Sequence, residues 1–471
     1  MKRRSFLTGS TLFGLSSLVL PSWTFSAQNT PIFPSKKTHP KQAKNIIFLV
    51  SDGMSMGTLS LADQFMRMKN GKSTEWISLY EKKECTRALM DTASLNSLVT
   101  DSAAGGSAWG CGYRVENGKI NVGPNGERYT PILQKYKKAG KSVGCVTTVP
   151  ITHATPASFC VNNEDRSGQD QIAMDYLNLR FDVMMGGGDL YFSESTRADK
   201  VNLYPLFESK GFDVLHKKED FKTVLQSEKP VLGVFDKDAL PYSIDNEADF
   251  TVPSLAEMTD FAINKLKMNK DGFVLQVEAG KVDWAAHAND TVALLNDQLA
   301  FDEAIGVALR FALEDENTLV VITTDHGNSN PGLLYGKSAT ENFKKVWTSK
   351  HSNEWILKGL TFETTPQQLI ERIEFASNCV LSIENATLLK NKFLEMNKEI
   401  SLLYNPYKLP FKELAQYQSL QTSVSWMGTN HTSDFVELCM IGPGSELLPA
   451  FIKNNQVHHF LLNATGLTPD F

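Results

Sequence analysis

The stretch Asn45-Ile46-Ile47-Phe48-Leu49-Val50-Ser51-Asp52-Gly53 indicates the fold of this 471-residue chain. An unbroken apolar run of this length is typical of a strand that is buried on both faces in a parallel sheet. An acidic residue and a glycine follow the run almost directly. The sequence therefore predicts a parallel sheet with a carboxylate, Asp52, just beyond the end of one strand.

Similar apolar runs recur along the chain and alternate with segments of helical periodicity. This alternation predicts an α/β fold, a three-layer sandwich with a mainly parallel central sheet. The expected strands are 45–50, 142–149, 181–185, 273–277, 319–322 and 435–441, and the expected helices include 130–139, 255–268 and 290–313.

Polar side chains follow several of the expected strands, where each strand ends. In open α/β sheets, ligands bind just beyond the carboxyl ends of the strands. Four strand ends that deliver metal-binding residue types to one edge predict a metal site there. These residues are Asp52, His153, Thr155, Glu278, Asp325 and His326.

The segment Val99-Thr100-Asp101-Ser102-Ala103-Ala104-Gly105-Gly106 places a serine behind an acid and ahead of small residues. This pattern suits a hydroxyl at the start of a helix, where backbone N–H groups converge on an anion. The same composition also fits a helix of small residues that packs closely. The segment alone leaves both interpretations open.

The segment 277–287 contains the most specific motif. Asp283 and His287 are four residues apart, so a helix places them on one face. Aspartate and imidazole are typical zinc ligands, and Glu278 can serve a neighbouring hard cation. The alternative is an ordinary helix start with Asp283 as its cap.

Further candidates lie elsewhere in the chain. Past a strand end, Asp325 and His326 can both reach one ion, although they also fit a hydrogen-bonded loop pair. His431 would be structural on its own, but beside the other motifs it is interpreted as a third ligand for the Asp283 and His287 ion. Arg166 offers a planar fork for phosphate oxygens, although alone it also fits a surface charge. His351 is assigned a structural role.

Together, and in this order, these motifs resemble the alkaline phosphatase family from Asn45 to the C-terminal region. The resemblance implies that Ser102, with Asp101 beside it, is a nucleophile that forms a phosphoserine, and that Arg166 holds two phosphate oxygens. It implies hydrolysis of phosphate monoesters, with release of inorganic phosphate.

The resemblance also implies two zinc ions and one magnesium ion. His153 and Trp284 stand at positions that vary within the family, near the magnesium ion and the phosphate. The implied ligands are Asp283, His287 and His431 for one zinc, Asp52, Asp325 and His326 for the second, and Asp52, Thr155 and Glu278 for magnesium, with Asp52 bridging.

Three other functions compete with a phosphomonoesterase. A phosphodiesterase of the same superfamily is the main alternative, and a nucleophilic threonine would favour it. A sulfatase needs a cysteine or serine in a C/S-x-P-x-R context, which the residues after Ser102 lack. A non-catalytic phosphate- or metal-binding protein would show a damaged ligand set, whereas every expected position is filled.

The bulk composition excludes some classes of protein. The net charge is −6, and it becomes more negative without the basic leader, so a nucleic-acid-binding face is not expected. No segment after the leader is long and apolar enough to predict a membrane span. The six cysteines form no C-x-x-C pair, so buried free thiols are expected, with disulfides left open.

The predicted organisation begins with an export signal. Residues 1–27 carry paired arginines before Phe6-Leu7, which indicates twin-arginine export to the periplasm or the medium, with an ordinary secretory leader as the alternative. Residues 28–44 form a polar linker, and residues 45–471 form one catalytic domain. Within it, residues 338–427 are predicted to be a cap or crown insertion, and a homodimer is left open.

Overall fold

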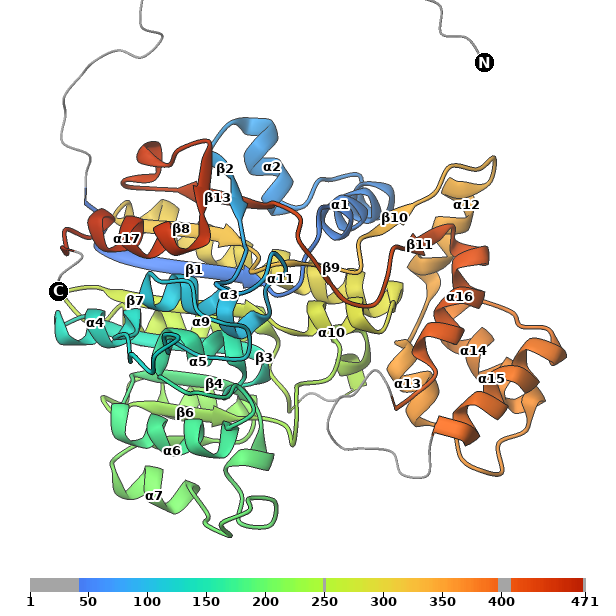
Figure 1. Ribbon diagram of the computed structural model, residues 1–471, viewed down its shortest axis with the longest axis horizontal. Helices are drawn as coiled ribbons and strands as arrows, with labels where there is room; N and C mark the ends of the chain where they lie inside the picture. Colours follow the sequence, from blue (N-terminus) through green and yellow to red (C-terminus); the bar gives the residue numbers. More distant parts are fainter. Residues whose placement is uncertain (1–41, 249–250, 397–407, 469–471) are drawn as a thin grey trace, which may run out of the picture. The chain divides into compact units, whose positions relative to one another are not determined.

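The fold is seen in a computed structural model that describes residues 42–248, 251–396 and 408–468. The predicted export signal and most of the predicted linker lie outside these residues. The described chain forms an α/β sandwich around a large central sheet (Figure 1). This confirms the predicted fold class.

The described part of the central sheet contains ten strands. Among them only β13 runs antiparallel to its neighbours, so the sheet is mainly parallel. In spatial order the strands are β14 (Phe451–Lys453), β2 (Thr86–Asp91), β13 (Val436–Ile441), β8 (Thr318–Thr323), β1 (Asn45–Ser51), β7 (Phe273–Ala279), β3 (Ser142–Pro150), β4 (Val183–Gly187), β6 (Val231–Val234) and β5 (Asp213–Leu215).

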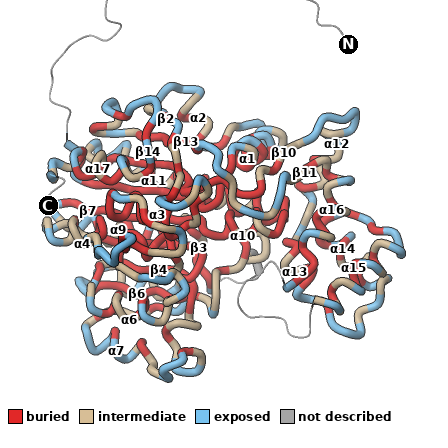
Figure 2. Tube along the Cα trace, viewed as in Figure 1, coloured by how far each residue is buried: buried red, intermediate tan, exposed pale blue. Residues whose placement is uncertain are grey.

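Strand β1 shows why its sequence is apolar without interruption. Ile46 and Phe48 contribute to the hydrophobic core on one face of the sheet, and Ile47 and Leu49 contribute to the core on the other face. Both faces are covered by helices, so alternate residues are buried equally. Figure 2 shows this burial along the central strands.

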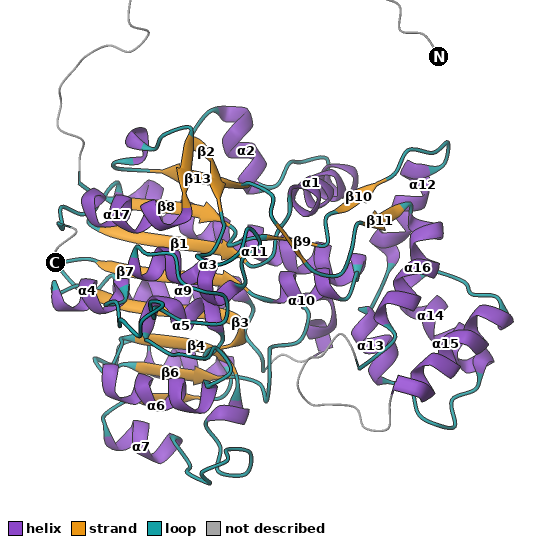
Figure 3. Cartoon of the chain, in the orientation of Figure 1, coloured by secondary structure: helices purple, strands orange, loops and turns teal. Residues whose placement is uncertain are grey.

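Helices cover both faces of the sheet (Figure 3). The core of one face includes residues of α3 (Ser102–Cys111), α4 (Ile132–Lys138), α5 (Ala154–Cys160), α6 (Gln169–Leu179), α7 (Tyr204–Ser209) and α17 (Asn454–Ala464). The core of the other face includes residues of α1 (Met56–Asn70), α2 (Glu75–Lys82), α8 (Phe221–Val224), α9 (Leu255–Leu266), α10 (Lys281–His287) and α11 (Thr291–Asp315).

The predicted insertion, residues 338–427, contains a group of helices with an apolar core of its own, to which Ile356, Leu369 and Phe411 contribute. Residues 366–396 contain two helices and not one, because Asn378 adopts the left-handed conformation and ends the first of them. The elements are α12 (Ala339–Phe343), α13 (Asn353–Lys358), α14 (Pro366–Ser377), α15 (Ile383–Met396), α16 (Phe411–Thr422) and β11 (Val424–Trp426), which pairs with β10 (Pro331–Leu333).

The register of the parallel strands brings their carboxyl ends to one edge of the sheet. Glu278 on β7 lies opposite Val50 on β1 and Thr147 on β3. Gly53 then turns the chain with a φ of 68°, and a Cβ atom there would lie 2.3 Å from Asp283 Oδ1. Only glycine fits this position without displacing a side chain of the site.

Within the residues described above, no helix is both long enough and apolar enough to cross a bilayer. All six cysteines lie in this part of the chain, and each is a free thiol. Five of them are buried, and Cys85 is half-buried.

Candidate active site

Ser102 is the first residue of α3 and lies at the edge of the sheet that carries the site. Its side chain is buried, and its Oγ lies 3.3 Å from Nε2 of His326. Asp101 caps the helix by accepting a hydrogen bond from the Ala104 N–H at 3.0 Å. The helix is also packed tightly against α5, since a Cβ on Gly110 would lie 2.0 Å from the Ser158 carbonyl oxygen. Ser102 therefore stands at the start of a helix, and the same helix packs closely through its small residues.

Arg166 reaches the same place from the loop after α5. Its Nη1 donates to Asp101 Oδ2 at 2.9 Å, and its Nη2 lies 3.2 Å from His153 Nε2. Burial alone would raise the pKa of Asp101, but Arg166 and the N–H groups of Ala104 and Gly118 lower it below its usual value. The ionised carboxylate thus holds the guanidinium beside Ser102.

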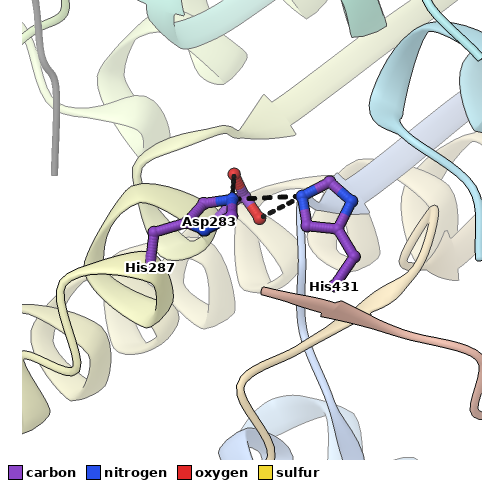
Figure 4. Close-up of side chains that lie close together, drawn as sticks. All are labelled: Asp283, His287 and His431. Carbon is purple, nitrogen blue, oxygen red and sulfur yellow. Dashed lines mark hydrogen bonds and ion pairs between the residues drawn. The ribbon is translucent and has the colours of Figure 1, made fainter. Parts of the chain in front are cut away.

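Asp283, His287 and His431 form the first group of converging ligand atoms (Figure 4). Nδ1 of His287 lies 2.7 Å from the Thr429 carbonyl oxygen, and Nδ1 of His431 lies 2.9 Å from the Thr100 carbonyl oxygen. A carbonyl only accepts, so each neutral ring carries its hydrogen on Nδ1 and presents a lone pair on Nε2. The two Nε2 atoms are 3.1 Å apart.

A strand pairing brings His431 into this group from the far end of the chain. His431 begins β12 (His431–Thr432), which pairs with β9 (Gly327–Asn328) directly after His326. The rings of His326 and His431 consequently stack with their centroids 3.7 Å apart.

Asp52, Asp325 and His326 form the second group, which is fully buried. His326 Nε2 lies 3.5 Å from Asp52 Oδ1 and 3.2 Å from Asp325 Oδ2. Neither oxygen of Asp52 accepts a hydrogen bond from any described residue. Burial, together with Asp325, Asp283 and Glu278, raises the pKa of Asp52 well above its usual value.

Asp52, His153 and Glu278 form a third group. Thr147 donates a hydrogen bond to Glu278 Oε2 at 2.5 Å, while Glu278 Oε1 has no partner among the described residues. Thr155 Oγ1 is buried and likewise without a described hydrogen-bond partner. His153 therefore brings a ring nitrogen close to the two carboxylates, as expected for a strand-end residue of the metal site, whereas the family resemblance placed it only near the magnesium ion.

Comparisons with known proteins agree with this geometry. The family model described as alkaline phosphatase matches residues 43–467. The chain belongs to the alkaline phosphatase family. Alkaline phosphatase 4 of Bacillus subtilis (strain 168) is 31% identical over 442 residues, which cover 91% of this chain and 90% of that protein. Alkaline phosphatase of Escherichia coli (strain K12) is 30% identical over 368 residues, which cover 67% and 78%.

A solved structure supports the same assignment. The crystal structure of Thermus thermophilus alkaline phosphatase superposes with a TM-score of 0.84 at 30% identity, covering 93% of this chain and 96% of that one. Membership of the alkaline phosphatase family makes this chain a metal-dependent phosphoric monoester hydrolase.

The converging nitrogen and oxygen atoms of the three groups are suited to binding cations. When both rings are neutral, the two imidazole lone pairs that face each other repel, and buried carboxylate oxygens without donors are costly. A cation at each group would satisfy both kinds of atom. The first two groups, which contain imidazole nitrogens, suit zinc. In the third group, the carboxylate oxygens of Asp52 and Glu278 and the Thr155 hydroxyl suit magnesium, whereas His153 offers a nitrogen that magnesium does not prefer.

Some contributors to the site were missed by sequence reasoning. Asn328 donates from Nδ2 to Asp283 Oδ1 at 2.7 Å and so orients that carboxylate. The carbonyl oxygens of Thr100 and Thr429 fix two histidine rings, although a backbone group leaves no mark in a sequence. Asn328 follows Asp325-His326-Gly327 closely, and this proximity was its only sequence signal.

Trp284, a predicted neighbour of the phosphate, lies on α10 beside His153. Their rings meet edge to face with centroids 6.4 Å apart. The indole therefore forms part of the surroundings of the Arg166 guanidinium, to which His153 is hydrogen bonded.

We expect the buried carboxyl groups of the metal-free site to destabilise the protein as the pH rises from about 5 to 7, an effect that the lowered pKa values of His153, His326 and His431 oppose below about pH 6.5. Burial is the main cause that raises the pKa of Glu278 to about 7 and that of Asp325 to about 6. In this range the folded protein keeps protons that the unfolded chain has released. The contribution of these two carboxyl groups to stability is therefore highest below their unfolded pKa values and falls toward the folded ones.

Thermal melting across this pH range, with chelator and with zinc plus magnesium, measures the effect. The melting temperature of the metal-free protein should fall more steeply with pH than that of the loaded protein. Buried carboxyl groups outside the site, such as Asp302, change the slope of both forms alike. Equal slopes of melting temperature against pH for the two forms would therefore mean that the site carboxyl groups have no effect, which would contradict the prediction.

Proposed function

We propose that the protein hydrolyses phosphate monoesters in two steps, with Ser102 as the nucleophile. The observation that supports this is the convergence of three groups of buried ligand atoms on one edge of the sheet, beside Ser102 and Arg166. A hydroxyl is a weak nucleophile unless it loses its proton, so Ser102 needs cations bound at these groups to activate it.

In the first step, Ser102 Oγ loses its proton and attacks phosphorus, and the bond from phosphorus to the ester oxygen breaks. The alcohol takes up a proton and leaves, and the phosphoryl group stays on Ser102. In the second step, water attacks the phosphoserine, the bond from phosphorus to Oγ breaks, and Ser102 regains a proton as phosphate departs.

Arg166 binds the phosphoryl group during both steps. Its Nη1 and Nη2 are each oriented by one neighbour, Asp101 and His153, and each keeps a second N–H. Those N–H groups can hold two non-bridging oxygens in the bidentate manner typical of arginine.

We assign two zinc ions and one magnesium ion to the three groups. Asp283, His287 and His431 would hold the first zinc, and Asp52, Asp325 and His326 would hold the second. Asp52, Thr155 and Glu278 would hold magnesium, with His153 beside them. When bound, two cations near a phosphoryl group lower the pKa of a nucleophilic hydroxyl and stabilise the attacking and leaving oxygens.

We further propose that the enzyme acts outside the cytoplasm, in the periplasm or the medium. The support is the sequence of residues 1–27, in which Arg3 and Arg4 precede Phe6. Twin-arginine export carries folded proteins, so metal ions could be bound before export.

An aryl phosphate monoester, compared with the matching diester at about pH 9, tests the substrate class, because the histidine ligands are then unprotonated. A preference for the monoester by several orders of magnitude is expected, since Arg166 and the cation proposed for the third group would neutralise its additional negative oxygen. A preference for the diester would support a phosphodiesterase of the same superfamily and contradict the proposal.

Replacing Arg166 with lysine is expected to lower kcat/KM for the monoester by about tenfold to a hundredfold. Lysine keeps the charge but loses the fork that binds two oxygens. Steady-state kinetics at matched zinc content measure the effect, and Arg128→Lys, at an exposed guanidinium, serves as the control. Equal losses in both variants would contradict the role given to Arg166.

A further inference from the structure

Helix α10 is short, yet it carries two ligands of the first group. It has seven residues, Lys281–His287, and includes Asp283, Trp284 and His287. A helix of this length is not stable by itself. Contacts with neighbouring parts of the chain must therefore fix its position.

The insertion holds the first residue of this helix. The Lys281 side chain is only 3% exposed, and its Nζ lies 3.7 Å from Oε2 of Glu354, the second residue of α13. The same ammonium group lies 3.6 Å from the ring centroid of Tyr242 and 5.1 Å from that of Trp284. A buried ammonium needs an opposite charge, so this ion pair restrains the start of α10.

The insertion also holds the chain just beyond the other end of α10. Asn353, which precedes Glu354, donates its backbone N–H to Asp290 Oδ2 at 2.5 Å. The other oxygen of Asp290 caps α11. Ala288, the residue after α10, is buried in the same apolar cluster as Ile356 of α13. Two consecutive residues of α13 thus bind the chain on both sides of α10.

Polar contacts matter here because the space beside α10 is not filled. A cavity of about 500 Å³ is lined by Lys281 and Trp284 of α10 and by Glu354 and Trp355 of α13. Apolar packing between the two helices is consequently limited at this place. The Lys281–Glu354 ion pair crosses the contact between the two helices.

We propose that the start of α13 is a positioning element for the first metal group, with Glu354 acting through Lys281 and Asn353 acting through Asp290. The insertion is then part of what places Asp283 and His287 for zinc. This inference rests on the proposed function, because it takes these two side chains as zinc ligands. Groups that support metal ligands from outside commonly change metal affinity tenfold or more when removed.

Zinc titration of the metal-free protein, in competition with a chromophoric chelator, tests this proposal without measuring activity. The first site is identified as the one that His287→Ala loses. Glu354→Gln and Lys281→Met should each weaken zinc binding at that site by about tenfold or more and leave the second site unchanged. The double variant should weaken it by less than the product of the two effects, because both changes break one contact.

Two controls separate positioning from general stability. Lys281→Arg keeps the charge and should bind zinc nearly as the unchanged protein does. Lys358→Met removes the other partner of Glu354, which lies within α13 itself, and should leave zinc binding unchanged.

Several results would overturn the inference. The inference is wrong if Glu354→Gln and Lys281→Met bind zinc at the first site as tightly as the unchanged protein does. It is also wrong if the two variants weaken zinc binding at all sites equally and lower the melting temperature of the metal-free protein. A titration in which His287→Ala loses no site would instead refute the proposed metal assignment, and the inference with it.

Discussion

Replacing Ser102 with alanine is expected to lower turnover of a phosphate monoester by about a thousandfold or more. The variant removes the oxygen that would receive the phosphoryl group. The metal ions should remain, because the three ligand groups are built from other side chains. Steady-state hydrolysis of an aryl phosphate, together with elemental analysis of zinc and magnesium, measures both parts of the prediction.

Ser107→Ala is the matched control for this experiment. Ser107 is also buried on α3, but its Oγ accepts the Asn121 N–H at 2.8 Å. Its loss should lower stability by about 1 kcal/mol and leave turnover nearly unchanged. Turnover by Ser102→Ala within tenfold of the unchanged enzyme, at full metal content, would rule out Ser102 as the nucleophile.

Replacing Asp52 with asparagine is expected to have the second largest effect. Asp52 belongs to both the second and the third group, and both of its oxygens are buried without described donors. Asparagine keeps the shape but loses the negative charge and one acceptor. We expect weaker binding at two metal sites and a loss of turnover of about a hundredfold or more.

Metal content after dialysis and turnover at saturating metal measure this effect. Asp302→Asn provides the control, because Asp302 is another buried aspartate but accepts the N–H groups of Glu75 and Trp76. Full metal content and normal turnover in Asp52→Asn would show that Asp52 does not bridge two ions.

The central layers of the fold could be predicted because burial on both faces makes their strands mainly apolar. β1 and β8 are almost wholly apolar, and β3 and β7 keep apolar runs beside a few buried polar residues. Four strands of the sheet were missed. β5, β6 and β14 have only three or four residues and carry little periodicity, and β2 is not a continuous apolar run because it is only partly buried. The break between α14 and α15 depends on the backbone conformation of Asn378, which the helical pattern around it does not reveal.

The ligand residues could be proposed because carboxylates and histidines at strand ends are chemically distinctive. Their grouping in space is less readable from sequence. His153 joins Asp52 and Glu278 because the turn after β3 directs its ring toward them, and no spacing rule shows that direction. The role of Glu354 depends on a contact between α13 and α10, which are far apart in sequence.

The site also explains how an acidic protein can attract an anion. The chain has a net charge of −6, so its long-range field does not favour phosphate. Arg166 and the cations proposed for the three groups would supply positive charge locally. High salt should consequently weaken phosphate binding less than in an enzyme that depends on a broad basic surface.

Trapping the covalent intermediate shows directly whether Ser102 is the nucleophile. The metal-loaded enzyme is mixed with an aryl phosphate, quenched in acid within its first turnovers, and digested for peptide mapping by mass spectrometry. We expect a phosphoryl group on Ser102 that disappears when substrate is exhausted. A phosphoryl group on Thr100 or Ser107 instead would contradict it.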